Sequence, residues 1–135
     1  MLKSLCSGLV LSLLLGVSVE TSVAEDTDAT VYELRTYTTH PGRLPALNKR
    51  FKEHTVKLFE KHGMTNVMYW TPVDKDDTLI YVLKHKSTDD AKKSWEGFRG
   101  DPQWIKARDE SEKDGKIVMK VESVYMKVTD YSPMP

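Results

Sequence analysis

Hydrophobic and polar residues follow two different periods along this chain, and the two periods predict its secondary structure. Four stretches rich in β-branched and aromatic residues predict strands over residues 31–38, 67–71, 78–85 and 117–128. Between residues 44 and 62, apolar side chains recur every three or four positions, which predicts one long amphipathic helix that ends before Gly63.

A second helical region begins after residue 87. Ser87 with Asp90 three positions later is typical of a capping box, and Gly97 and Gly100 are expected to interrupt the helix that follows. Asp101 and Pro102 predict a fresh helix start, and this piece is expected to run to residue 112.

The predicted order, strand, helix, strand, strand, helix, strand, is typical of one fold class. It is the βαββαβ pattern of the ferredoxin-like α+β fold, with a four-stranded antiparallel sheet and the helices on one face. The other sheet face carries apolar residues and would be bare, and the last strand is longer than usual. We therefore expect a homodimer in which two sheets close into a dimeric α/β barrel.

The first 24 residues read as a secretory signal peptide. Lys3 precedes a short apolar run over residues 9–17, and Ser22 and Ala24 supply the small residues of a cleavage site. The run is too short for a membrane span, and the stretch lacks the arginines of a mitochondrial presequence. We expect a secreted or periplasmic protein with no stable membrane insertion after cleavage, a polar leader at 25–29, one domain at 30–131 and a tail at 132–135.

The amino-acid composition indicates which classes of binding partner to expect. The chain has 20 basic and 20 acidic residues, so its net charge is zero, and this balance argues against nucleic acid. Its single cysteine, Cys6, lies in the predicted signal, so the mature chain has no disulfide to reinforce a thin core. Oligomerisation is the remaining support.

The alternation of side chains between the two faces of the first strand indicates a candidate site. Glu33, Arg35 and Tyr37 share one face, and the more apolar set of residues 32, 34 and 36 is expected to face the helices. Glu33, Arg35 and Tyr37 would then point into the barrel interior, where Arg35 could clamp an anionic ligand and Tyr37 could donate a hydrogen bond. The alternative is that Glu33 and Arg35 form a cross-strand ion-pair network that closes the dimer.

Residues on other strands extend this candidate site. Trp70, Tyr81 and Met119 would offer flat apolar walls for a hydrophobic ligand if their strands face inward, or they would simply pack in the core. His85 closes the third strand and is a candidate general base, although an exposed histidine at a strand end is commoner.

Motifs for metals and cofactors are missing from the sequence. None of the four histidines stands three or four residues from another, and the turn with Asp74, Asp76 and Asp77 lacks the glycine and glutamate of a calcium loop. Phosphate-cradling glycine loops and nucleophile elbows are missing too. We therefore expect neither a metal nor a cofactor.

Several short motifs together resemble a known family. They are Tyr32-Glu33-Leu34-Arg35-Thr36-Tyr37, then Pro41-Gly42, Trp70, and Asp101-Pro102 with Trp104. Placed in this order, from about residue 30 to residue 131, they are similar to the NIPSNAP domain. The resemblance implies a dimeric ferredoxin-like barrel related in shape to cofactor-free monooxygenases, and it implies no established reaction. The turn over residues 74–78 departs from many members, which carry Gly and Asn there.

Two functions fit these observations. The first is an exported binding or interaction module whose barrel holds a small hydrophobic or anionic molecule, or supports assembly. The alternative is a cofactor-independent monooxygenase that holds an electron-rich organic substrate against oxygen, and it rests on fold analogy. A cavity with Arg35 or a histidine pointing into it would separate the two.

Overall fold

The computed structural model describes residues 30–133. The predicted signal peptide, the polar leader and the end of the tail lie outside the described residues. Among the described residues, no helix is both long enough and apolar enough to span a bilayer.

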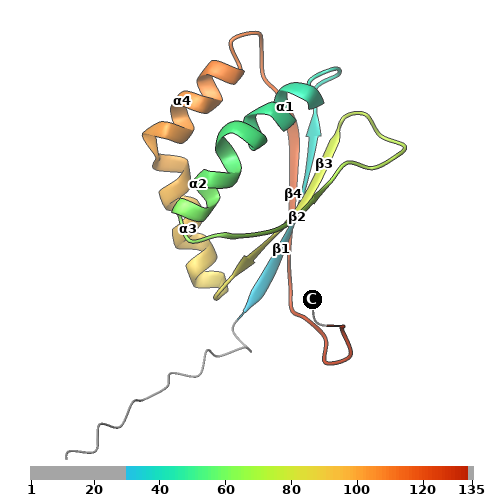
Figure 1. Cartoon of the computed structure of the whole chain (residues 1–135), viewed down its shortest axis with the longest axis vertical. Helices are drawn as coiled ribbons and strands as arrows, with labels where there is room; N and C mark the ends of the chain where they lie inside the picture. The colour runs from blue at the N-terminus through green and yellow to red at the C-terminus, as the bar shows by residue number, and fades with distance from the viewer. Residues whose placement is uncertain (1–29, 134–135) are drawn as a thin grey trace, which may run out of the picture.

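The described chain forms one antiparallel sheet with all its helices on one side (Figure 1). The strands are β1 (Val31–Thr39), β2 (Thr65–Trp70), β3 (Thr78–His85) and β4 (Val118–Met126), in the spatial order β2-β3-β1-β4. The chain is therefore ferredoxin-like, and the predicted fold class is confirmed. Strand β4 covers nine residues rather than the dozen expected, because pairing with β1 starts only at Val118 and stops at Met126.

The first helical run extends from Leu44 to Lys61, as predicted, but its middle is wound differently. It comprises α1 (Leu44–Arg50), the π-helical turn η1 (Phe51–Thr55) and α2 (Val56–Lys61). The Thr55 hydroxyl donates to the Arg50 carbonyl oxygen at 3.3 Å, which satisfies an acceptor inside the widened turn.

The second helical region confirms both predicted starts. Helix α3 (Thr88–Gly100) begins at Ser87, whose hydroxyl accepts from the Asp90 amide at 3.0 Å. Helix α4 (Pro102–Ser111) begins at Asp101, whose carboxylate accepts from the Gln103 amide at 2.8 Å. The interruption expected at Gly97 was wrong, since α3 runs through it, and the break falls after Gly100.

The core fills the space between the helices and one face of the sheet. Its largest members are aromatic, and Phe59 and Tyr81 are almost completely buried. The opposite sheet face is open and apolar, with Met68, Trp70 and Val124 each more than two-fifths exposed. The sheet therefore has one face packed on helices and one face with no cover in the single chain.

Candidate functional site

Glu33, Arg35 and Tyr37 of β1 face the helices, so the expected assignment of the two strand faces was wrong. The Glu33 side chain is only 1% exposed and reaches Trp95 on α3, and the Tyr37 ring packs edge-on against Phe51 at 5.9 Å. Leu34, expected in the core, alternates with them and belongs to the open face. The expectation that the more apolar face of the strand packs against the helices fails here. Distant elements supply hydrogen-bond donors for Glu33, so its charge can be buried.

Glu33 is the centre of the site and receives four side-chain donors. Its Oε1 accepts from Arg35 Nη1 at 2.6 Å and from the Ser123 hydroxyl at 2.7 Å. Its Oε2 lies 2.9 Å from His85 Nε2 and accepts from Trp95 Nε1 at 2.7 Å. These partners come from β1, β4, β3 and α3, so the complete fold is needed to assemble the cluster.

This geometry requires an ionised carboxylate. The indole of Trp95 and the guanidinium of Arg35 are donors only, and each meets a different oxygen of Glu33. Burial raises the pKa of Glu33, but the hydrogen bonds from His85, Trp95, Ser123 and Arg35 outweigh it and lower the pKa to about 2.

Arg35 combines an ion pair with stacking, and part of its donor capacity is unused. Its guanidinium carbon lies 4.1 Å from the ring centroid of Trp95, a cation–π contact. Burial lowers the pKa of Arg35, but Tyr37, Tyr81 and the Glu33 carboxylate raise it above its ordinary value. The Nε atom is buried and has no hydrogen-bond partner in the described chain.

Two more polar atoms of this region lack partners among residues 30–133. They are the Tyr81 hydroxyl and His85 Nδ1, both buried. Because Nε2 of His85 faces the ionised carboxylate of Glu33, we assign a proton to Nε2, and Nδ1 is left without a hydrogen-bond partner in the described chain. Burial raises the pKa of the Tyr81 phenol well above its ordinary value, so the phenol stays protonated.

The structure brings five of the seven predicted site residues together. Glu33, Arg35, Tyr37, Tyr81 and His85 all lie on the helix-facing side of β1 and β3. The cluster reaches the surface at β4, where Ser123 is exposed and the Arg35 side chain is 15% exposed.

Two expected members lie elsewhere. Trp70 pairs with Ile80 on the open sheet face and is 44% exposed, and Met119, at the irregular start of β4, is 58% exposed. The expected Glu33–Arg35 ion pair exists, but it joins residues two apart on one strand and faces the helices rather than a dimer contact.

Sequence reasoning missed Trp95 and Ser123. Trp95 is buried on the core side of α3, and the only sequence signal for its role is that a buried indole N–H needs an acceptor. Ser123 carries no local signal at all. No group of three His, Cys, Asp or Glu residues able to hold a metal occurs between residues 30 and 133.

Fold and site together define a class of protein. It is a ferredoxin-like α+β domain with one buried carboxylate, that of Glu33, surrounded by hydrogen-bond donors between the sheet and the helices. The family model named NIPSNAP matches residues 32–133, and the chain belongs to the NIPSNAP family. No curated protein matches the sequence.

Solved structures share this fold. A NIPSNAP family protein with unknown function from Agrobacterium tumefaciens is 23% identical, with a TM-score of 0.66, covering 77% of this chain and 92% of its own. A NIPSNAP-like domain protein from Burkholderia xenovorans is 11% identical, with a TM-score of 0.68, covering 78% and 90%. SnoaB, a cofactor-independent oxygenase from Streptomyces nogalater, is 14% identical, with a TM-score of 0.59, covering 78% and 99%. At these identities the likeness concerns the fold alone.

Proposed function

We propose that this protein binds a small hydrophobic or anionic molecule at the cluster around Glu33 and Arg35. The observation that carries the proposal is the set of three buried polar atoms without partners, Arg35 Nε, the Tyr81 hydroxyl and His85 Nδ1. A buried polar group without a hydrogen bond costs about 1–3 kcal/mol, so a ligand that satisfies these atoms gains that energy back.

The surroundings of these atoms define the ligand. Arg35 supplies positive charge and unused donor capacity, while the rings of Tyr37, Tyr81 and Trp95 supply flat apolar surface. A planar organic anion matches both features. The exposed side of the cluster at β4 is where such a molecule would approach.

Native mass spectrometry of the protein purified from its own source tests this proposal. Wild type is expected to retain a small molecule, and Arg35→Leu is expected to lose it, because the apolar side chain fills space but cannot pair with an anion. Arg108→Leu is the control, since the Arg108 side chain is 43% exposed on α4 and pairs with Asp109 rather than with Glu33. Equal ligand content in all three proteins would refute the site.

The same proposal includes export and assembly. We propose that the mature chain begins at Glu25, which the intact mass of the exported protein would test. We also propose that two copies bury their open sheet faces against each other, because Met68, Trp70 and Val124 expose a wide apolar surface that water solvates poorly.

A cofactor-independent oxygenase is the second candidate. His85 Nδ1, a buried ring nitrogen with no partner in the described chain, favours it, because a base at this atom would remove a substrate proton and give an electron-rich anion that reacts with oxygen. Oxygen uptake with a panel of phenols tests this candidate. Uptake that His85→Asn abolishes would favour the enzyme, whereas ligand retention without uptake would favour the binding protein.

A further inference from the structure

A groove separate from the cluster around Glu33 lies on the helical layer, between the first helical run and α4. One part of the groove, about 280 Å³, runs between α1 and the end of α4, and a neighbouring part of about 370 Å³ continues along α2. Both parts share Glu53, His54, Ala107 and Glu110.

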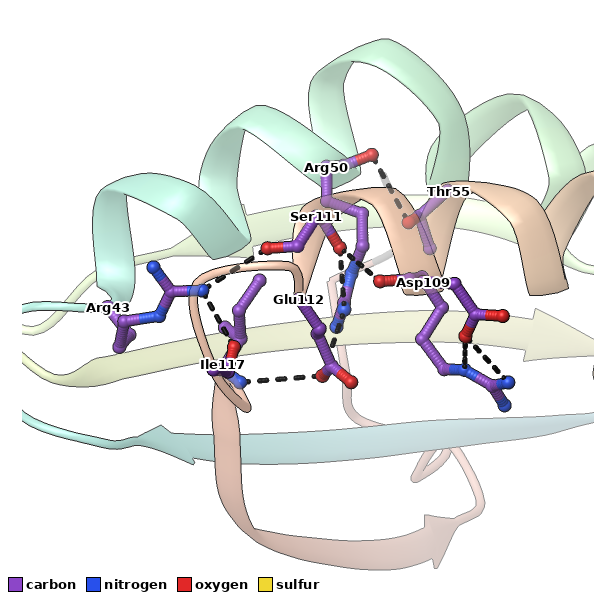
Figure 2. Close-up of polar contacts among 9 residues, drawn as sticks. Arg43, Arg50, Thr55, Asp109, Ser111, Glu112 and Ile117 are labelled. Atoms are coloured by element: carbon purple, nitrogen blue, oxygen red, sulfur yellow. Dashed lines mark hydrogen bonds and ion pairs between the residues drawn. The ribbon is translucent and has the colours of Figure 1, made fainter.

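Arg50 is buried at one end of this groove with an incompletely compensated charge. Its side chain is 3% exposed and points from α1 toward the end of α4 (Figure 2). Nη1 donates to the Ser111 hydroxyl at 3.2 Å and lies 3.4 Å from the Glu112 carboxylate, while Nε is buried with no partner in the described chain. Burial lowers the pKa of Arg50, as expected when nearby anions do not fully replace water.

Two further cations stand at the same end. Arg43 Nη2 donates to the carbonyl oxygens of Ser111 and Gly115, at 3.2 and 2.9 Å, and so occupies the negative end of α4 (Figure 2). Lys49 is exposed at the rim. Asp114 lines this end and Glu112 pairs with Arg50, so the three cations Arg43, Lys49 and Arg50 still exceed the acidic residues here by one.

The middle of the groove has the opposite sign. Glu53 and Glu110 both line it and are about half exposed. Each has only a distant ion-pair partner: His54 Nε2 lies 3.9 Å from Glu53, and Lys106 Nζ lies 4.0 Å from Glu110. These carboxylates are therefore free to meet a cation, and they repel a ligand that carries only negative charge.

We propose that this groove binds a small zwitterion, with its oxyanion beside Arg50 and Lys49 and its ammonium group between Glu53 and Glu110. The charge pattern matches both ends of such a molecule. At about 30 Å³ for each water-sized group, the 280 Å³ part suits a molecule of roughly nine such groups.

A purely structural role for the arginines makes a different prediction. If Arg43 and Arg50 only hold the end of α4, no small molecule gains from the groove, and substitutions at its rim change nothing. Lys49 and Glu53 are exposed, and neither forms a hydrogen bond or ion pair with α4 among residues 30–133, so their variants test binding without unfolding the protein.

The experiment is a titration of the full mature protein, followed by NMR or calorimetry, with phosphoethanolamine, inorganic phosphate and ethanolamine as probes. Phosphoethanolamine is expected to bind more tightly than either fragment. Lys49→Ala is expected to weaken the binding of phosphoethanolamine about 1.5-fold to fivefold, the usual range for an exposed charge pair. Lys52→Ala, a lysine of η1 outside the groove lining, is the control and should change nothing.

Glu53→Gln separates a zwitterion site from a plain anion site. It is expected to weaken phosphoethanolamine and to strengthen inorganic phosphate, because it removes both the ammonium partner and the repulsion. Phosphate binding equal to phosphoethanolamine in wild type would overturn the proposal. Equal effects of Lys49→Ala and Lys52→Ala, or no binding of any probe, would overturn it too.

Discussion

Glu33→Gln is the substitution that tests the buried cluster most directly. Glutamine has nearly the same size, but its amide group places two N–H donors where the carboxylate accepts hydrogen bonds. One pair of donors, either Arg35 and Ser123 or His85 and Trp95, then faces another donor. Arg35 also loses its ion-pair partner in a mostly buried position.

The magnitude follows from the pKa of Glu33. A pKa of about 2 in the fold against an ordinary 4.5 corresponds to about 3 kcal/mol of folding free energy. Removal of one partner from a buried ion pair typically costs about 3–5 kcal/mol, in agreement with that figure. Because the pKa is depressed on folding, this stabilisation is fully present above pH 4.5 and is lost as pH falls toward 2.

Urea denaturation followed by tryptophan fluorescence, at one fixed protein concentration, measures both effects. At pH 7 we expect Glu33→Gln to lower the free energy of unfolding by about 3–5 kcal/mol. The deficit should shrink as pH falls from 4.5 toward 2, because wild-type Glu33 becomes protonated there. Glu96→Gln, on the exposed side of α3, is the matched control and should track wild type.

A parallel loss of stability by wild type and Glu33→Gln over this pH range would refute the stabilising role of the ionised Glu33 carboxylate. A cost at pH 7 no larger than that of Glu96→Gln would refute it as well. Trp95→Phe adds a second check, since it removes one donor and keeps the charge, and we expect a smaller loss of about 1–3 kcal/mol.

Three further substitutions test packing and assembly. Gly100→Ala should raise the free energy of unfolding by about 0.4–1 kcal/mol in chemical denaturation, because a Cβ there meets nothing within 4 Å. Gly97→Ala should give no such gain, since its Cβ would lie 2.8 Å from His62 Nδ1, and an equal gain at both positions would contradict the helix packing. Val124→Asp, on the open sheet face, should turn a sedimenting dimer into a monomer or an aggregate, and a wild-type monomer at micromolar concentration would contradict the dimer.

The sequence by itself determined the order of the elements and the starts of α3 and α4, because those depend on neighbours along the chain. Ser87 and Asp101 cap the helices that they were predicted to cap, since each side chain bonds an amide two or three residues ahead. The two-residue period likewise placed Glu33, Arg35 and Tyr37 on one side of β1.

Only the tertiary structure decided which side that is. Polarity alone directs a carboxylate and a guanidinium away from the helices, because burying a charge without partners is costly. The partners of Glu33 lie 52, 62 and 90 residues away in the chain, at His85, Trp95 and Ser123. No local pattern reveals that these three donors converge on one carboxylate, and their convergence is what makes the buried charge stable.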